Sequence, residues 1–263
     1  MERSTLIGII IGLIAVGFGM VLKGAPLSSL LTNPAAYLII FGGTIAAVLN
    51  AFPMSQLKKV PVLFKILFTR QVLISRTELI DHFMTWAQTA RREGLLALEN
   101  SIDEIKDPFL KNGMKMVVDG REMEFIRDAL EQDIEAMQSR HQSGAQIFSQ
   151  AGTYAPTLGV LGAVIGLIAA LGNLSDIEQL GHAIAAAFVA TLLGIFTGYV
   201  LWHPFANKLR QKSKEEVELK RLMIEGILSI QAGISPSNIE EKLLVYLPAA
   251  EREERWRTKH VEK

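Results

Sequence analysis

The sequence predicts an all-α, polytopic membrane protein with four transmembrane helices and a helical cytoplasmic domain. Four long apolar runs contain no Asp, Glu, Lys or Arg, and nearly all of the charge lies in two blocks outside them. A helix needs about 20 predominantly apolar residues to cross the hydrocarbon core of a bilayer. The four predicted spans are Ser4–Leu22, Pro34–Phe52, Ile147–Gly172 and Gly181–Trp202.

These spans divide the 263 residues into four parts. Residues 1–52 hold transmembrane helices 1 and 2, residues 53–146 a cytoplasmic helical domain, residues 147–202 transmembrane helices 3 and 4, and residues 203–263 cytoplasmic C-terminal helices. The domain at 53–146 has 13 basic and 14 acidic residues, and the C-terminal part has 12 and 10. This balance argues against a nucleic-acid-binding surface. The absence of cysteine excludes disulfides and thiolate metal sites, and we expect no cofactor.

The cations predict the orientation, because cytoplasmic loops carry an excess of Lys and Arg. The connection Lys23–Asn33 has one cation, and the connection Asn173–Leu180 has only the acidic Asp176 and Glu178. Both termini are therefore predicted to be cytoplasmic. The first span is too long for a secretory signal and no small-x-small cleavage site follows it. The cations on the predicted inner side are Lys58, Lys59, Lys65, Arg140, Lys208, Arg210, Lys212 and Lys214.

The block between spans two and three is predicted to be helical. Apolar residues recur every three or four positions within Arg76–Leu98 and within Gly120–Gln142, as on the buried side of a helix. Asp107-Pro108 and Asn112-Gly113 are predicted to break the chain between these helices. The two stripes are Leu79, Ile80, Phe83, Trp86, Ala87 and Ala90, and Phe125, Ile126, Ala129, Leu130, Ile134 and Met137.

The C-terminal block is predicted to continue span four as a charged helix over Asn207–Ala232, followed by a shorter helix over Ile239–Leu247. The segment Glu251–Lys263 is charged enough to be a frayed tail. No segment predicts a strand. The apolar residues interleaved in the first of these helices are Val217, Leu219, Leu222, Met223, Ile224 and Ile227.

Spans three and four differ from the others in their small and hydroxyl-bearing residues. Small residues four apart let helix backbones approach closely in lipid. The hydroxyl groups either bond a carbonyl one turn back or line a pathway. The small residues are Gly162, Gly166 and Ala170 in span three and Ala186, Ala190, Gly194 and Gly198 in span four; the hydroxyl-bearing residues are Thr153, Tyr154, Thr157, Thr191, Thr197 and Tyr199.

Two prolines accompany this pair of spans. Pro156 and Pro204 free the carbonyl oxygens of Gly152 and Val200, so each predicts either a kink in the helix or a bend at the membrane boundary. No span contains Asp, Glu, Lys or Arg, the groups that proton relays and ion-coupled carriers use. If this protein moves an ion, a partner must supply the titrating group. The same absence disfavours a solute carrier, and no catalytic motif predicts an enzyme.

Three motifs, in this topological order, resemble the A subunits of bacterial flagellar stators, most closely those of Bacillus-type bacteria. They are Arg-Arg-Glu-Gly-Leu-Leu-Ala-Leu-Glu at 91–99, Ala-Gly-Thr-Tyr-Ala-Pro-Thr-Leu-Gly at 151–159 and Ala-Thr-Leu-Leu-Gly-Ile at 190–195. The similarity extends from about Thr5 to Leu247. The related ExbB/TolQ type, an alternative, has three spans and lacks the first motif.

The resemblance implies a stator subunit of the bacterial inner membrane. In that family a homo-oligomer of A subunits, a pentamer, surrounds a dimer of motility protein B, whose aspartate accepts the ion, and ion flow drives rotation. Pro156 and Pro204 match prolines that couple ion binding to conformational change. Tyr154, Thr157 and Thr191 are candidates to line the pathway. Arg91 and Glu99, with Arg92 beside them, match charges that contact the rotor protein FliG.

The ion is predicted from one position. Sodium-driven stators resemble Gly-Thr-Leu-Ile-Gly-Leu in span three, whereas this chain has Gly162-Ala163-Val164-Ile165-Gly166-Leu167. Hard cations are held by several oxygen ligands, and the methyl group of Ala163 supplies none. A proton-driven stator is therefore predicted, with a sodium-driven stator as the alternative.

Overall fold

A computed structural model describes residues 2–71, 73–172 and 177–261, and these residues are helical with no strand among them. This confirms the predicted all-α class. The chain forms two compact units. The first, here called the span unit, contains Met1–Gln71 and Arg140–Lys212; the second, called the charged unit, contains Val72–Ser139 and Ser213–Lys263.

Four helices among the described residues are long and apolar enough to cross a membrane, as predicted. Span one is α1 (Arg3–Leu22), and α2 (Ser28–Leu31) follows it. Residues 173–176 of the predicted connection between spans three and four, which include Asp176, lie outside the described residues. The remaining spans comprise α3 (Pro34–Tyr37), the π-helix η1 (Leu38–Gly42) and α4 (Gly43–Ala51), then α10 (Met123–Leu171), and then α11 (Ile177–Phe196) with the π-helix η3 (Thr197–Trp202).

Spans three and four are parts of longer helices. The predicted helix Gly120–Gln142 and the predicted span from Ile147 are one 49-residue helix, α10. Span four passes through η3 directly into α12 (His203–Gln231), which confirms the predicted continuation. The π-helix has a local cause: Pro204 has no N–H to donate, and His203 N–H reaches the Gly198 carbonyl five residues back.

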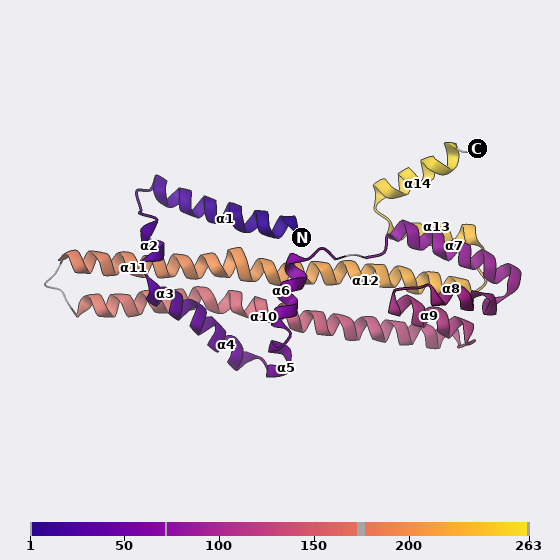
Figure 1. Cartoon of the computed structure of the whole chain (residues 1–263), viewed down its shortest axis with the longest axis horizontal. Coiled ribbons are helices and arrows are strands. Elements are labelled where there is room, and N and C mark those ends of the chain that lie inside the picture. Colours follow the sequence, from indigo (N-terminus) through magenta and orange to yellow (C-terminus); the bar gives the residue numbers. More distant parts are fainter. Residues whose placement is uncertain (1, 72, 173–176, 262–263) are drawn as a thin grey trace. The chain divides into compact units, whose positions relative to one another are not determined.

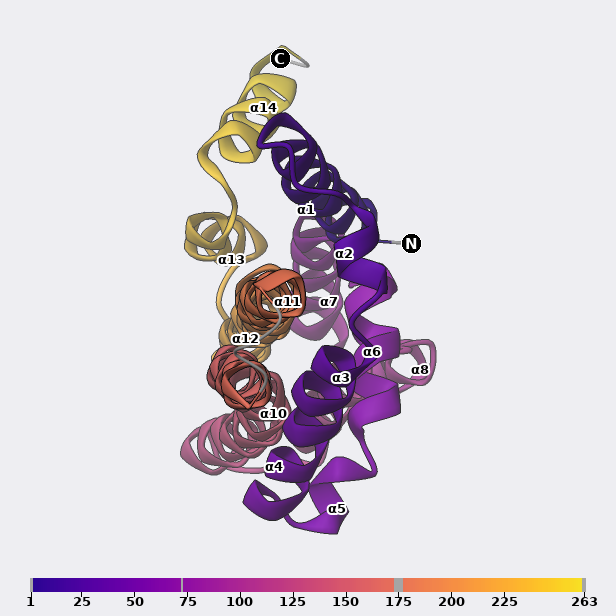
Figure 2. The ribbon, with the colours of Figure 1, turned by 90° about the vertical axis from the view of Figure 1, so that its left-hand side faces the viewer.

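One end of the span unit is closed by two short helices, α5 (Met54–Leu57) and α6 (Val60–Phe68). Within this unit α6 lies across the direction of α10 and α11 (Figures 1 and 2). The Phe64 ring lies 5.0 Å from that of Phe148 and 6.4 Å from that of Trp202. These rings join a buried apolar cluster with Leu67, Ala145, Phe205, Ala206 and Leu209.

Lys212 holds the same end together. Its ammonium group donates to the carbonyl oxygens of Ile66 at 2.6 Å and Thr69 at 2.7 Å, at the C-terminal end of α6. Lys212 and Lys208 each lie 3.4 Å from the carboxylate of Glu2. Burial alone would raise the pKa of Glu2. The two lysines lower the pKa by a larger amount, so it lies below its ordinary value. The carboxylate therefore stabilises this fold above its ordinary pKa, and that contribution is lost as the pH falls through the lowered pKa.

The charged unit has its own apolar core. The stripe of α7 (Arg76–Glu93) is confirmed, with Leu79, Ile80, Phe83, Trp86 and Ala87 buried. The apolar residues predicted in α12 are also buried. The other elements of this unit are the 3-10 helix η2 (Leu95–Leu98), α8 (Glu99–Asp103), α9 (Pro108–Val118), α13 (Pro236–Leu243), the 3-10 helix η4 (Leu244–Tyr246) and α14 (Ala249–Val261).

Two details of the predicted core are wrong. Asn112-Gly113 does not break the chain but lies inside α9, because Gly113 provides space: a Cβ there would lie 2.5 Å from Ile227 Cδ1. The predicted break at Asp107-Pro108 is confirmed, since Asp107 caps α9 by accepting from Leu110 N–H at 3.0 Å. Phe125 is 55% exposed instead of buried, and its ring lies under the Arg121 guanidinium at 5.9 Å.

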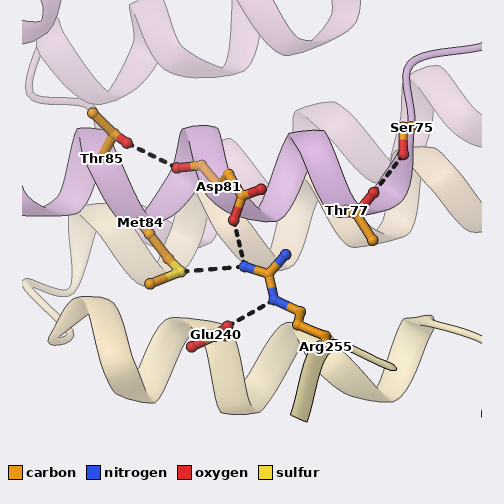
Figure 3. Close-up of polar contacts among 7 residues, drawn as sticks. All are labelled: Ser75, Thr77, Asp81, Met84, Thr85, Glu240 and Arg255. Atoms are coloured by element: carbon orange, nitrogen blue, oxygen red, sulfur yellow. Dashed lines mark hydrogen bonds and ion pairs between the residues drawn. The ribbon is translucent and has the colours of Figure 1, made fainter. Parts of the chain in front are cut away.

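The predicted frayed tail is also wrong over residues 251–261, because α14 extends to Val261; Glu262 and Lys263 lie outside the described residues. Figure 3 shows the cause: the Arg255 guanidinium pairs with Asp81 of α7 and, through Nε at 2.7 Å, with Glu240 of α13. Burial alone would lower the pKa of Arg255. Its hydrogen bonds to the two carboxylates raise the pKa by a larger amount, so it lies above its ordinary value. A charge-rich segment is thus fixed by one long side chain that reaches two helices.

Candidate functional site

The span unit contains a seam where α10 meets α11 and η3 with their backbones in direct contact. A Cβ on Gly194 would lie 2.7 Å from the Ala155 carbonyl oxygen and 2.8 Å from Gly159 Cα. A Cβ on Gly159 would lie 2.8 Å from the Ala190 carbonyl oxygen. No side chain fits between backbones at these distances. The close approach predicted from small residues is therefore confirmed, and we call this contact the glycine seam.

The glycine seam brings both predicted prolines to one short stretch. A Cβ on Gly198 would lie 2.7 Å from Pro156 Cγ and 2.8 Å from the Gly152 carbonyl oxygen, which is the oxygen that Pro156 frees. A Cβ on Gly152 would lie 2.8 Å from the His203 ring, and His203 directly precedes Pro204. Both prolines thus weaken helical hydrogen bonding where the two spans touch.

The threonine hydroxyl groups of the two spans bond carbonyls of their own helices. Thr157 donates to the Tyr154 carbonyl at 2.7 Å, and Thr191 donates to the Ala187 carbonyl at 3.3 Å. Thr197 is buried and donates to the Leu193 carbonyl at 2.9 Å. Thr157 is exposed, while Tyr154 and Thr191 are half-buried. These three threonine hydroxyl groups are therefore satisfied locally, and Thr157 and Thr191 are the two that are not buried.

The seam itself is apolar and uncharged. Ala163 is half-buried and directly follows Gly162, at which a Cβ would lie 3.5 Å from Ala190 Cβ. Thr191 directly follows Ala190. Among the described residues no cluster of His, Cys, Asp and Glu could hold a metal ion. This site can pack, flex and accept a neighbouring group, but no Asp, Glu, Lys or Arg in its spans can take up a proton.

The charged motif at 91–99 forms a separate surface on the charged unit. Arg91 and Arg92 lie in the last turn of α7, which ends where Gly94 adopts φ +88°, a conformation that favours glycine. Leu98 is fully buried, so it fixes the position of Glu99, the first residue of α8. Arg91, Arg92 and Glu99 are all exposed. The fold thus presents these charges to solvent on two adjoining helix ends.

Sequence reasoning missed several residues of the seam. Gly152 and Gly159 lie in its tightest part, although neither belongs to the four-residue pattern noted in span three. The hydroxyl of Thr44 in span two is buried and has no hydrogen-bond partner among the described residues. A pattern of seven-residue spacing, from Gly152 to Gly159 to Gly166, was the available signal for the glycines.

Comparisons with known proteins agree with this arrangement. A model of the motility protein A N-terminal family matches residues 6–94, and a model of the MotA/TolQ/ExbB proton channel family matches residues 101–221. Motility protein A of Bacillus subtilis (strain 168) is 62% identical over 252 residues, which cover 96% of this chain and 93% of that protein.

Two solved structures are similar over nearly the whole chain. The flagellar MotAB stator complex from Bacillus subtilis contains a chain with a TM-score of 0.91 and 61% identity, covering 96% of this chain and 99% of that one. The structure of C. jejuni MotAB contains a chain with a TM-score of 0.88 and 31% identity, covering 95% and 97%.

Proposed function

Because this chain belongs to the motility protein A family of MotA/TolQ/ExbB proton channels, it is a multi-pass membrane subunit of a flagellar stator and not an enzyme, and we propose how it works. The glycine seam is the element that responds to the ion, and the charges at 91–99 transmit force. The match of residues 6–94 to the motility protein A model favours this function over the ExbB/TolQ alternative.

The proposed mechanism starts from the absence of Asp, Glu, Lys and Arg in the spans. Spans that contain no Asp, Glu, Lys or Arg cannot relay a proton by themselves, so a second subunit supplies the carboxylate. The similarity to chains of two MotAB structures supports motility protein B as that subunit. We propose that five copies of this chain surround a dimer of motility protein B, and that its aspartate faces spans three and four.

The coupling step follows from the glycine seam. When the partner aspartate takes up or releases a proton, its electrostatic fit to the surrounding spans changes. Pro156 and Pro204 remove helical hydrogen bonds at the seam, which lets these helices bend at a lower energetic cost. Repeated around the ring, such bending rotates the A subunits about the B dimer. Tyr154, Thr157, Thr191 and Ala163 border the path that the ion follows.

We expect swimming powered by this stator to depend on the proton gradient. Ala163 supplies no oxygen for a dehydrated sodium ion, and the single hydroxyl oxygen of Thr191 does not make up the several oxygen ligands that a hard cation needs. The test uses a strain that lacks its own stators and expresses this chain with its motility protein B. Swimming speed is measured across a sodium series at fixed pH and membrane potential, and again with a protonophore.

Speed that is independent of sodium and abolished by the protonophore supports proton coupling. Speed that rises with sodium and survives the protonophore contradicts it and leaves the stator function intact. No swimming under either condition, with the protein present in the membrane, contradicts the stator function itself. An empty vector provides the baseline.

The surface at 91–99 is proposed to contact FliG. Arg91, Arg92 and Glu99 are exposed, and none of them pairs with an acidic or basic group among the described residues. Exposed charges add at most about 1 kcal/mol to folding stability. At an interface such charges steer association and exclude wrong partners. These properties suit a contact that forms and breaks during each step.

Reversing Arg91 or Glu99 is expected to weaken engagement of the rotor by roughly five- to tenfold, because like charges then face each other across the contact. Arg91→Glu and Glu99→Arg are compared for swimming speed and for torque at several loads. Arg127→Glu, which reverses another exposed cation of the charged unit, is the matched control. All variants are checked for equal amounts in the membrane. Unchanged torque in the double reversal would show that other charges make the contact.

We also infer that both termini lie in the cytoplasm of a bacterial cell and that the spans cross its inner membrane. The basic residues after span two and span four support this orientation. With this orientation the charged unit lies on the rotor side of the membrane. The same side then holds Lys212, Glu2 and helix α6.

A further inference from the structure

The segment at residues 53–71 is strongly basic. It contains Lys58, Lys59, Lys65 and Arg70 and no Asp or Glu. Lys58 directly follows α5, Lys59 directly precedes α6 and Lys65 lies in the last turn of α6. All four side chains are exposed, and no carboxylate in the described part of the chain pairs with them. Four exposed cations without a single compensating acid make this segment a surface that favours an anionic partner.

Helix α6 has two sides of different character. Leu67 is fully buried, and Leu63 and Phe64 pack with it in the apolar cluster. On the other side Val62 is 58% exposed and Ile66 is 39% exposed, next to the exposed Lys65. An exposed side that combines apolar residues with lysines is typical of a helix lying in a membrane interface. Lysine stems there cover apolar surface while their ammonium groups reach the phosphates.

The position of α6 agrees with this character. Glu2, just before span one, donates its backbone N–H to the Phe68 carbonyl at 2.9 Å. Phe64 lies against Phe148 near the start of span three and against Trp202 at the end of span four. Span ends therefore meet at α6, which runs across α10 and α11 within the span unit (Figure 1). A helix across the ends of spans lies along the membrane surface.

We propose that the outer side of α5 and α6 binds anionic phospholipid headgroups of the cytoplasmic leaflet. Lys58, Lys59 and Lys65 contact the phosphates, and Val62 and Ile66 enter the boundary of the acyl chains. Zwitterionic headgroups bring no net negative charge, whereas anionic headgroups complement a segment with four cations and no acid. Span two, which directly precedes α5 in the chain, also exposes the apolar side chains of Ile45 and Leu49, which supports lipid over a protein as the occupant.

The test measures lipid composition next to α5. The chain has no cysteine, so Ser55→Cys, an exposed position in α5, takes a single bimane fluorophore. The labelled full chain is placed in phosphatidylcholine vesicles that contain a small, equal fraction of either doxyl-labelled phosphatidylglycerol or doxyl-labelled phosphatidylcholine. We expect the anionic quencher to be roughly threefold or more effective than the zwitterionic one at low salt, and less so at high salt.

The triple variant K58Q/K59Q/K65Q is expected to bring the two quenchers to equal effect. K106Q/K115Q/R127Q removes the same charge from exposed positions of the charged unit and should preserve the preference. Bimane at Asn100→Cys in α8 should show no preference. Equal quenching by both lipids in the otherwise native chain would overturn the proposal, as would a preference that survives the triple variant. Absence of quenching by either lipid would also overturn it, because another protein surface would then cover α5 and α6.

Discussion

Replacing Gly194 by alanine is expected to lower the free energy of unfolding by about 1–3 kcal/mol and to stop swimming. The new methyl group would lie 2.7 Å from the Ala155 carbonyl oxygen and 2.8 Å from Gly159 Cα. Both are backbone atoms, so neither can rotate aside. Relief requires α10 and α11 to separate by about 0.7 Å, the difference between 2.7 Å and the 3.4 Å at which ordinary contact begins. That separation alters the glycine seam next to Pro156, since Ala155 supplies the contacted carbonyl oxygen.

Gly8→Ala is the matched control, because Gly8 lies in α1 and has no atom within 4 Å of its Cβ position. It makes the same chemical change in a span and should leave stability unchanged or raise it by up to about 1 kcal/mol through helix propensity. Stability is measured by thermal unfolding in detergent and function by swimming speed. If Gly194→Ala matched Gly8→Ala in both measurements, the close approach of the spans would not be needed for function.

Hydrophobic pattern predicted most of the helices because burial and bilayer crossing both act through it. The stripe of α7 and the apolar residues of α12 are buried as predicted, and the four spans are present. The failures occur where a single contact outweighs the local signal. Gly113 predicts a break in the helix, but it lies inside α9, where the Ile227 side chain occupies the space that a side chain at Gly113 would need. The charge of Glu251–Lys263 predicts a frayed tail, but Arg255 pairs with the carboxylates of Asp81 and Glu240, which lie elsewhere in the sequence.

The candidate site was predictable in its residue types but not in its arrangement. Small residues in spans three and four predict close packing, and the missing ionisable groups predict a partner. Which glycines touch depends on the register between two helices, and a sequence does not contain that register. The contact of Gly152 with His203 joins the neighbourhoods of Pro156 and Pro204, which lie 48 positions apart by number (204 − 156). Roles at the rotor depend on a partner surface, so Arg91 and Glu99 remain predictions.

Arg255→Met is expected to lower the free energy of unfolding of the charged unit by about 2–3 kcal/mol, because hydrogen bonds to charged groups are among the stronger ones and the change takes a guanidinium away from a buried carboxylate. Glu240 is only 6% exposed and accepts from Arg255 Nε at 2.7 Å (Figure 3). Asp81 is exposed, so losing its partner costs little. Without Arg255, α14 loses its ion pairs with α7 and α13. The change is measured by denaturation of the full chain and by the rate of trypsin cleavage after Arg252.

The control is Arg257→Met, since the one ion pair of Arg257 within the described part of the chain is with the exposed Glu253 at 3.9 Å, and its loss should change stability by less than about 0.5 kcal/mol. A second variant separates the buried charge from the lost connection. In Arg255→Met with Glu240→Met the buried carboxylate is removed together with the guanidinium, so we expect part of the stability to return while α14 stays open to trypsin. Equal stability of Arg255→Met and Arg257→Met would show that α14 is held by its apolar contacts. The tail would then be fixed by burial and not by the bridge of Arg255.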